Sequence, residues 1–476
     1  MKNLVICLIA SGASAFSLFI VYVFLATAPA PEVAAQIVIT SRTPEDILSV
    51  SVDNEYGSFR FYFDLDENGF VVDGIPPHLV DLSAFYSFLQ NSAVIVAISG
   101  LSADDSNLQD FGLAPPRAAV EIEFFDGATL NLGIGEAELI SGNYYMSVDG
   151  YDDVFIISAV VAEQFLRPRN DIISMSLTPP LGLSSPLSAV RDITFSGTGL
   201  SRPVTIVSTA DADEETSLMA LSFGIATHIV QSEGVYGLDQ AYGITLFEPL
   251  FNLRAVDILA YNLSYNELSD FGLDEPYIAV DFDMISGIDA PIVPVSLRFA
   301  QADDGLYYAT RMGSGAVYLV GRLPFFDIEF ERLVLRWFLT PFLMDLSSIT
   351  VSFQYETFRF EIDASDTRDI RVYHDGQPLD MELFHVFFRL ITSAAHDGVF
   401  LGTLEQGDGT PLLTIKYEYT HPDKNPDVLT LFPGDVRRAN VFINGIGEFS
   451  MNDLFIRRVT DGAKNLIAGN TIEADW

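Results

Sequence analysis

The chain contains an internal copy of part of its own sequence, and this repeat limits the fold more than any other feature does. Residues 50–88 recur 299 positions later, as residues 349–387, without an insertion or a deletion. In both copies two strand-like runs precede a helix-like run that is opened by an aspartate, Asp81 or Asp380. An aspartate at this place accepts hydrogen bonds from the first backbone amides of a helix. The repeat therefore predicts tandem modules of related structure.

A second repeat links the first and the middle third of the chain. Residues 110–113 read Asp-Phe-Gly-Leu and recur 160 positions later as residues 270–273. Each copy is followed by an alternating strand-like run and later by a tyrosine pair, at 144–145 and at 307–308. The final third has similar strand-like runs, but it lacks the Asp-Phe-Gly-Leu turn. We therefore expect three modules, the third of which is divergent.

Composition along the chain predicts where these modules begin and end. The stretch 178–188, rich in proline, glycine and serine, marks the first junction. The predicted modules are residues 44–178, 187–346 and 347–476. We expect helix-rich segments to close the first two modules, for instance Ala159–Phe165 and Ile328–Phe338.

The alternation of apolar and polar residues in the strand-like runs favours antiparallel sheets. Such a sheet has one face against the core and one face in water. With a helix expected on the buried face of each sheet, the predicted fold class is α+β. It consists of three tandem related modules of antiparallel sheet plus helix, preceded by one N-terminal transmembrane helix.

The N-terminal segment predicts an attachment to a membrane. Residues 4–25 carry no charge, and 22 residues are long enough to cross a hydrocarbon core of about 30 Å as a helix. Lys2 precedes the segment and Glu32 follows it, which places the remainder of the chain outside the cytoplasm. We expect an uncleaved anchor over residues 1–28 and a spacer over residues 29–43. A cleaved signal peptide is the alternative, with small-residue sites after the apolar segment.

The charge and the single cysteine restrict the partners and the compartment. The chain has 65 acidic and 25 basic residues, a formal net charge of −40. Phosphate backbones would repel it, so nucleic-acid binding is excluded as a function class. Cys7, inside the apolar segment, is the single cysteine of the chain, so no intramolecular disulfide can form. These features favour a single-pass protein of a bacterial cell membrane, with its bulk outside the cytoplasm.

Two acidic runs are candidates for a cation site. Residues 64–69 begin like a calcium loop, but the twelfth position is Ile75, which cannot ligate a metal ion. Asn68 and Gly69 instead favour a type I′ hairpin turn. Residues 211–215 are a second acidic run, which we interpret as a solvated loop.

The remaining candidates for chemistry favour structural roles. His374, His385, His396 and His421 lack the spacing of a zinc-binding helix, and His385 aligns with Tyr86 through the long repeat, as a structural position would. A Ser/His/Asp site stays open, although the chain has no Gly-x-Ser-x-Gly motif.

The glycine and tyrosine motifs are also interpreted structurally. Residues 133–135 read Gly-Ile-Gly but lack the third glycine of a dinucleotide site. The Asp-Phe-Gly-Leu runs lack the other motifs of a kinase, so Gly112 and Gly272 are expected to permit turns whose Phe and Leu enter the core. The tyrosine pairs could stack on sugars, but we expect one member of each pair in the core. We assign no catalytic, cofactor-binding or metal-ligating residue and expect no cofactor.

Taken together, these motifs resemble those of a known family. An anchor, a strand hairpin, an Asp-capped helix, Asp-Phe-Gly-Leu-x-x-Pro at 110–116, Gly-Ile-Gly and a tyrosine pair resemble a bacterial family known only as a domain of unknown function. The likeness covers the first module nearly end to end and the second from about Leu250 to Trp337. The family is typically membrane-anchored, built from tandem copies and linked with auxiliary components of gliding-motility-type ABC transporters. The resemblance implies transporter subunits as partners, and it implies no reaction.

The predicted function is that of a non-enzymatic, membrane-anchored extracytoplasmic accessory or scaffold protein, auxiliary to an ABC-type transporter. One alternative is a surface module that binds a glycan, a peptide or a cation, since the chain is acidic and rich in aromatic residues. A third is a hydrolase acting on the cell wall, because paired carboxylates can serve as acid and base. Calcium and a cell-wall ligand therefore stay open as partners.

Overall fold

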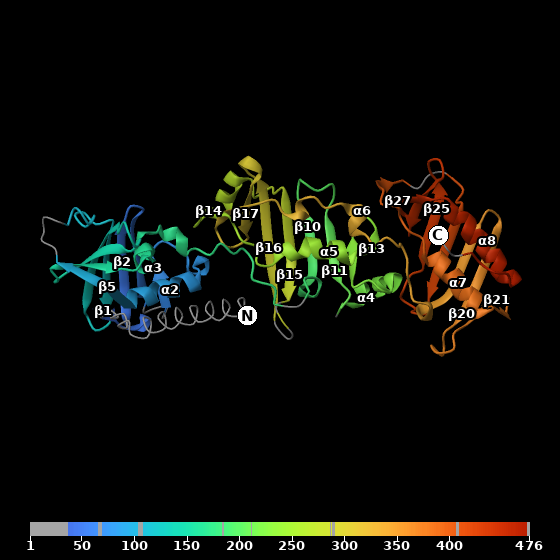
Figure 1. Ribbon diagram of the computed structural model, residues 1–476. Helices are drawn as coiled ribbons and strands as arrows, with labels where there is room; N and C mark the ends of the chain where they lie inside the picture. Colours follow the sequence, from blue (N-terminus) through green and yellow to red (C-terminus); the bar gives the residue numbers. More distant parts are fainter. Residues whose placement is uncertain are drawn as a thin grey trace, which may run out of the picture. The chain divides into compact units, whose positions relative to one another are not determined.

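The computed structural model describes residues 37–473, apart from 65–68, 103–107, 183–184, 211, 286, 288–290 and 406–408 (Figure 1). The predicted anchor, Cys7 and most of the predicted spacer lie outside the described residues. The chain forms two compact units, Met1–Ser174 and Met175–Trp476.

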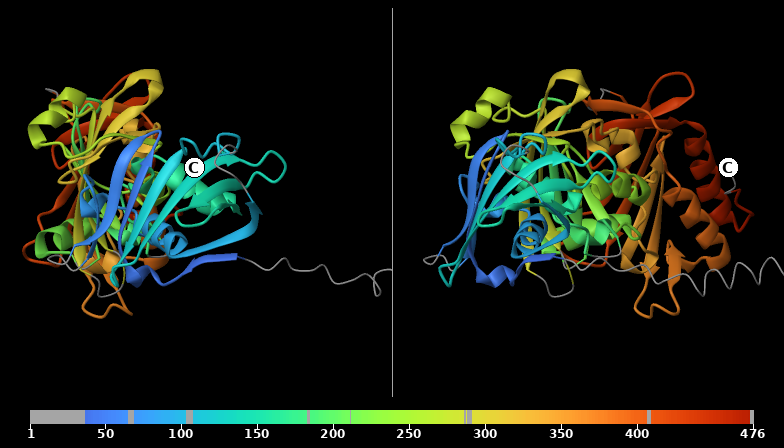
Figure 2. Two further views of the ribbon diagram at one scale, coloured as in Figure 1. Left: turned by 90° about the vertical axis from the view of Figure 1, so that its left-hand side faces the viewer. Right: turned by 60° about the vertical axis from the view of Figure 1, so that its left-hand side comes forward.

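The described part of the chain forms three nine-stranded antiparallel sheets. The first lies in the first compact unit, and its strongly twisted strands run from blue to cyan in Figure 2. Its strands, in spatial order, are β1 (Ile37–Ser41), β5 (Val94–Ser102), β9 (Asp153–Ile157), β8 (Tyr144–Val148), β7 (Thr129–Ala137), β6 (Ala118–Phe124), β2 (Ile47–Asn54), β3 (Gly57–Asp64) and β4 (Gly69–Val72).

The other two sheets lie in the second unit. The order of the second is β13 (Val235–Gly237), β12 (His228–Gln231), β11 (Val204–Ser208), β10 (Val190–Ser196), β15 (Ile278–Ile285), β16 (Ile292–Gln301), β17 (Tyr307–Arg311), β18 (Val317–Val320) and β14 (Asp257–Ala260). The order of the third is β22 (Gln377–Pro378), β21 (Arg371–His374), β20 (Glu356–Asp363), β19 (Leu346–Phe353), β24 (Leu413–Tyr419), β25 (Asp427–Pro433), β26 (Arg438–Ile443), β27 (Ile446–Asn452) and β23 (Phe400–Leu404).

The three sheets share one topology. The strands β5-β9-β8-β7-β6-β2-β3-β4 correspond in order to β14-β18-β17-β16-β15-β10-β11-β12 and to β23-β27-β26-β25-β24-β19-β20-β21. The remaining strand is β1, at the β5 edge of the first sheet, whereas β13 and β22 lie at the opposite edge of theirs. The final third of the chain therefore has the same strand order as the first two, although it lacks the Asp-Phe-Gly-Leu turn.

The α-helices of the described chain are few and short, so the predicted α+β class is wrong and the protein is mostly β. The helices are α2 (Leu82–Ala93), α3 (Ala159–Leu166), α4 (Glu214–Ala220), α5 (Gln240–Phe247), α6 (Phe330–Leu333), α7 (Met381–Thr392) and α8 (Leu454–Ala468). None of the described helices is long and apolar enough to cross a bilayer, and the longest, α8, has 15 residues.

The expected closing helices show why the helical content was overestimated. The first, Ala159–Phe165, is confirmed as α3. The second, Ile328–Phe338, is wrong, because only the four residues of α6 are helical. Beyond α6 the backbone amides of Leu335 and Phe338 donate to the carbonyls of Gly237 and Ala394. These tertiary hydrogen bonds replace the bonds that a helix would form and override the helical pattern of the sequence.

The aspartates predicted to open helices are confirmed. The Asp81 carboxylate accepts from the amides of Ser83 and Ala84, at 2.9 and 3.1 Å, and so begins α2. Asp380 begins α7 in the same way, because its carboxylate accepts from the amides of Glu382 and Leu383, at 2.8 and 3.1 Å. Asp239 accepts from the amide of Tyr242 at the start of α5. A helix with the same cap thus follows the first strands of each sheet.

The helices α2 and α7 pack their apolar side chains on one face of their sheets. Phe61 of β3 and Phe88 of α2 lie with ring centres 4.2 Å apart, and the repeat partners Phe360 and Phe387 lie 5.4 Å apart. Both strand phenylalanines are fully buried. Alternate residues of the same strands point away from the helices and are polar, as the period of two requires. The first and third sheets thus have an apolar face under helices and an open polar face, whereas in the second sheet Met219 of α4 contacts Gln231 on the polar face.

A buried ion pair connects the second and the third sheet within the second compact unit. Arg202, between β10 and β11, pairs with Glu448 of β27, whose side chain is completely buried. The hydroxyl of Tyr236 donates to the same carboxylate at 2.7 Å. The guanidinium also lies 4.5 Å from the ring centres of Phe330 and Phe400. Burial and the adjacent Glu448 carboxylate raise the pKa of Tyr236 well above its ordinary value.

We expect the helix caps to contribute measurably to stability. Asp81→Ala and Asp380→Ala should each lower the free energy of unfolding by about 1 kcal/mol, because two amides lose their acceptor. Urea unfolding followed by circular dichroism measures the change. Asp453→Ala is the matched control, because Asp453 stands at the N-cap of α8 without a side-chain cap hydrogen bond. An equal loss in all three variants would contradict this role of the caps.

Breaking the buried ion pair should be costly. Glu448→Gln leaves the Arg202 charge without its counter-ion inside the protein, and we expect a loss of about 3 kcal/mol or more. Arg368→Ala removes an exposed ion pair with Asp366 and should cost less than about 1 kcal/mol. The double variant Arg202→Met/Glu448→Leu should recover much of the loss, since no unpaired charge remains. Urea midpoints that rank the variants otherwise would refute this account of the pair.

Candidate functional site

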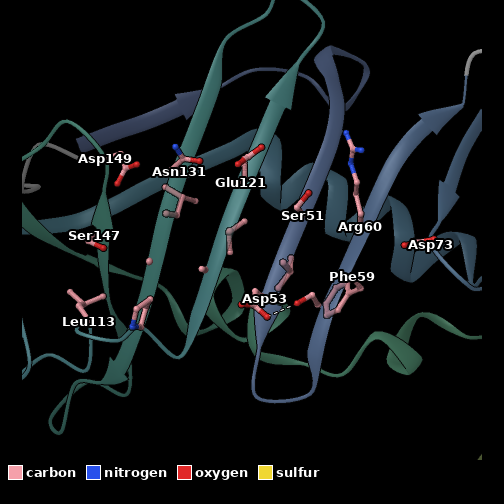
Figure 3. A pocket seen from close by; sticks show the side chains of 17 residues that line it. Ser51, Asp53, Phe59, Arg60, Asp73, Leu113, Glu121, Asn131, Ser147 and Asp149 are labelled. Atoms are coloured by element: carbon pink, nitrogen blue, oxygen red, sulfur yellow. Dashed lines mark hydrogen bonds between the residues drawn. The ribbon is translucent and has the colours of Figure 1, made fainter.

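The open face of the first sheet carries a groove with a volume of about 690 Å³ (Figure 3). Strands β2, β3, β6 and β7 form its floor, and it extends past the ends of β4 and β8. The polar side chains of its lining are Ser51, Asp53, Ser58, Arg60, Asp73, Glu121, Asn131, Ser147 and Asp149. This volume falls within the range of small-molecule and peptide sites, about 300–1,000 Å³.

Strand register places the central polar residues in a row across the sheet. Ser51 of β2 is the pairing partner of Arg60 on one side and of Glu121 on the other. Glu121 of β6 in turn pairs with Asn131 of β7. The backbone amide of Asp149 donates to the carbonyl of Asn131 at 3.1 Å, which extends the row beyond β8. In Figure 3 these labelled side chains follow one another from strand to strand.

Beside this row, a second carboxylate holds the arginine in place. Ser49, which is 1% exposed, donates its hydroxyl hydrogen to Glu123 at 2.6 Å. Arg60 donates to both groups, at 2.9 Å in each case. We call Ser49, Glu123 and Arg60 the serine–glutamate–arginine frame. Because all three groups satisfy one another, the frame fixes the direction of Arg60 at the edge of the groove.

The third sheet repeats this frame. Ser348 donates to Glu418 at 2.5 Å, and Arg359 lies 3.2 Å from the same carboxylate. Here Lys416 is an additional partner at 2.7 Å. Hydrogen bonds from Lys416 and then from Ser348 lower the pKa of Glu418 below its usual value. The frame is therefore a feature of the repeat and not of the groove alone.

The second sheet has lost the frame. Asp192 stands in place of the serine, and Thr205 stands in place of the arginine. The hydroxyl groups of Thr205 and Thr194 form a hydrogen bond with each other at 3.0 Å instead. Burial raises the pKa of Asp192, Arg191 opposes this effect, and the nearby carboxylate of Asp283 adds to it. One carboxylate oxygen of Asp192 has no hydrogen-bond partner in the described structure. The open faces thus differ in charge although their backbones correspond.

The groove of the first sheet has acceptors whose counterparts in the other sheets are neutralised or replaced by other residues. Within the described residues, the side chains of Glu121, Asn131 and Asp149 have no hydrogen-bond or ion-pair partner. At the position of Glu121 the second sheet has Asp281, which pairs with Arg298 at 2.9 Å, and the third has Lys416. Carboxylate and amide groups that face water without a protein partner are available to a ligand.

The Asp-Phe-Gly-Leu runs are turns, as predicted. Gly112 and Gly272 have φ of 68° and 69°, in the left-handed region that favours glycine. Leu113 and Leu273 are buried. Phe111 and Phe271 each contact the second tyrosine of the following pair, with ring centres 4.8 and 5.3 Å apart. The two motifs that the sequence shows separately therefore form one packing unit.

The tyrosine pairs and the Gly-Ile-Gly run belong to the same unit. Tyr307 is buried, as expected of one member of a pair, whereas both tyrosines of the pair at 144–145 are only partly buried. The amide of Glu136 donates to the carbonyl of Phe111 at 2.9 Å. A Cβ atom at Gly135 would lie 2.2 Å from that carbonyl oxygen. Gly135 thus allows the turn to lie against β7 and serves packing.

The predicted acidic sites have structural roles where they are described. The hairpin predicted around residues 64–69 is confirmed as the β3–β4 pair, in which Asp64 is the pairing partner of Gly69. Residues 65–68, between the two strands, lie outside the described residues. Asp213 begins α4 by accepting from Thr216, and these hydrogen bonds lower the pKa of Asp213. The described residues include no group of three or more His, Cys, Asp and Glu that could hold a metal ion.

The four histidines of the final third differ in burial and in their contacts. His396 is buried, with its ring 4.9 Å from that of Phe449, and burial lowers the pKa of His396. His374 contacts the carbonyl of Arg359 through Nδ1 at 2.9 Å. His385 and His421 are exposed. The structural interpretation of His385 therefore finds no support in burial, since the side chain lies on the outer side of α7.

Sequence reasoning did not single out the groove residues. The alternating run of β6 places Glu121 and Glu123 on the same face, but the sequence does not show which of them is engaged by an arginine. Aligning the repeats by strand order would have revealed that Glu121 corresponds to Lys416. That charge reversal is the signal in the sequence that distinguishes the first open face from the third.

Comparison with known families finds one match, which includes both Asp-Phe-Gly-Leu turns. Residues 80–276 match the family described as a domain of unknown function (DUF4340). The matched region includes α2, strands β5 to β9 of the first sheet and strands β10 to β14 of the second, but not β1 to β4. This part of the chain is thus similar to a family described as a domain of unknown function, as its motifs indicated. No curated protein and no solved structure matches the chain.

The two turn glycines should differ in their tolerance of a side chain. Gly272→Ala adopts a left-handed conformation at a cost of about 1 kcal/mol, and its Cβ atom finds room. Gly112→Ala should cost more than this, because its Cβ atom would lie 2.9 Å from the backbone nitrogen of Glu136. The difference in urea midpoint between each variant and the parent protein tests the ranking. Equal shifts would show that the turn at Gly112 moves freely against β7.

Proposed function

We propose that the protein is a non-catalytic accessory protein of the bacterial cell envelope. In this proposal the uncharged segment 4–25 holds the chain at the membrane, and the three sheets lie outside the cytoplasm as binding surfaces for partner membrane proteins. The subunits of an ABC-type transporter are the partners that the family resemblance favours.

The observation that carries the proposal is that three copies of one sheet each carry polar and charged groups on the corresponding face. Each face retains an arginine paired with a carboxylate: Arg60 with Glu123, Arg298 with Asp281, and Arg359 with Glu418. Helices cover the opposite faces of the first and third sheets, whereas in the second sheet Met219 of α4 contacts Gln231 on the polar face. A chain that repeats one exposed surface is suited to hold a partner at several places, since each additional contact raises the effective concentration for the others.

The charge of the chain supports basic partners. A net charge of −40 produces a negative potential that accelerates the approach of positively charged surfaces and repels acidic ones. The effect weakens with ionic strength because salt screens exposed charges beyond about 10 Å. An accessory protein of this kind should therefore lose partners as salt rises.

Purification from native membranes tests the proposal. The protein, tagged at its native level and extracted in mild detergent, should bring transporter subunits with it, identified by mass spectrometry. A wash at high salt should release part of them. Recovery of the protein without membrane partners at low salt would refute the accessory role.

A matched variant tests the attachment itself. With residues 1–36 replaced by a cleavable export signal, the protein should move from the membrane pellet to the soluble extracytoplasmic fraction. Immunoblotting of the fractions measures the change. A chain that remains in the pellet after a high-salt wash would show that other residues hold it at the membrane.

Ligand binding is a second candidate function, and the groove of the first sheet favours it. The volume of about 690 Å³ and the free carboxylate and amide groups are those of a binding site for a polar ligand.

A further inference from the structure

The free groups of the groove determine what kind of ligand fits. Glu121 and Asp149 offer carboxylates, and Asn131 between them offers an amide. The cation of the groove, Arg60, is already engaged by Glu123 at 2.9 Å. A ligand must therefore supply positive charges and hydrogen-bond donors, because anions would meet uncompensated carboxylates.

The separation of the two strand positions argues against a single metal ion bound by both carboxylates. Glu121 lies on β6 and Asp149 follows β8, two strands away. Neighbouring strands are about 4.8 Å apart, so the two backbone positions are separated by about 10 Å. Two oxygen ligands of one calcium ion lie at most about 5 Å apart. A ligand that satisfies both carboxylates must be extended and carry at least two charges.

The lining also argues against a glycan. Sugar rings commonly stack on exposed aromatic faces, but Phe59, the aromatic side chain of the lining, is only 8% exposed. An extended peptide has a more suitable shape. In a polyproline II helix every third side chain lies on the same side, after a rise of about 9.3 Å. Two basic residues at this spacing match the separation of the two carboxylates.

We propose that the groove binds an extended basic peptide segment of a partner protein. Glu121 and Asp149 pair with basic side chains three positions apart, and Asn131 bonds to the peptide backbone between them. The inference deepens the proposed function, because it names the chemistry by which a partner is held. The serine–glutamate–arginine frame supports the site by keeping Arg60 away from Glu121.

The other two sheets support the assignment of the site to the first. In the second sheet the three positions are Asp281, Ser296 and Met312, and Arg298 neutralises the aspartate. In the third they are Lys416, Val428 and Asn444, as the same pattern of backbone bonds shows. A basic peptide would thus meet an occupied carboxylate in one case and a lysine in the other.

Calorimetric titration of the full chain in mild detergent tests the inference. The probe is a synthetic proline-rich peptide with two lysines three positions apart, and the comparison peptide carries glutamates at the same places. The lysine peptide should bind, and Glu121→Gln/Asp149→Asn should weaken it at least about fivefold, a change that two partly exposed ion pairs can produce. Circular dichroism checks that the variant, which changes only exposed or partly exposed groups, remains folded.

Asp274→Asn/Glu275→Gln is the matched control. These exposed carboxylates follow the second Asp-Phe-Gly-Leu turn, and their replacement removes the same formal charge. The control should change the affinity by less than about twofold, because general attraction falls equally in both double variants. Equal weakening by both would overturn the site, and so would an equal affinity for the glutamate peptide.

Two further outcomes separate the alternatives. If spermine binds as tightly as the lysine peptide and with the same sensitivity to Glu121→Gln/Asp149→Asn, the groove is a polyamine site and the peptide assignment is overturned. If membrane partners still accompany the double variant during purification, the groove is not their attachment point, although the accessory role survives. If the peptide binds but no partner is recovered from membranes, the site stands and the accessory role fails.

Discussion

The strict alternation of side chains along a strand governs the three sheets. Apolar residues such as Phe61 and Phe360 point to the helices, and their neighbours must then point to water. Short helices can cover one face of a nine-stranded sheet but not both. Each repeat therefore exposes a broad polar face, and the functional differences among the repeats lie in the residues that this face carries.

Much of the repeat could be read from the sequence, because it depends on local patterns. Asp81 and Asp380 stand before helical runs in the same register, and both prove to be caps. Gly112 and Gly272 fit the turns they adopt. The helical content was overestimated for a nonlocal reason. The amide of Leu335 bonds to a strand far away in sequence, and no local pattern indicates such a partner.

The groove escaped sequence reasoning because its meaning depends on pairing across strands. Glu121 and Glu123 differ by two positions on one strand and are chemically identical. What separates them is a distant arginine, which reaches Glu123 and leaves Glu121 free. The same limitation applies to the buried pair of Arg202 and Glu448, which are 246 positions apart. Their chemistry is visible in the sequence only once the topology is known.

The two glutamates of β6 illustrate how a repeated fold separates stability from recognition. The frame on Glu123 recurs on Glu418 in the third sheet, where its hydrogen bonds restrict what can change at these positions. The position of Glu121 is free of that restriction, and it carries a glutamate, an aspartate or a lysine in the three sheets. Because these positions face water, each exchange alters the charge of the face at little cost to the core. A chain built in this way can keep one scaffold while its repeated surfaces acquire different partners.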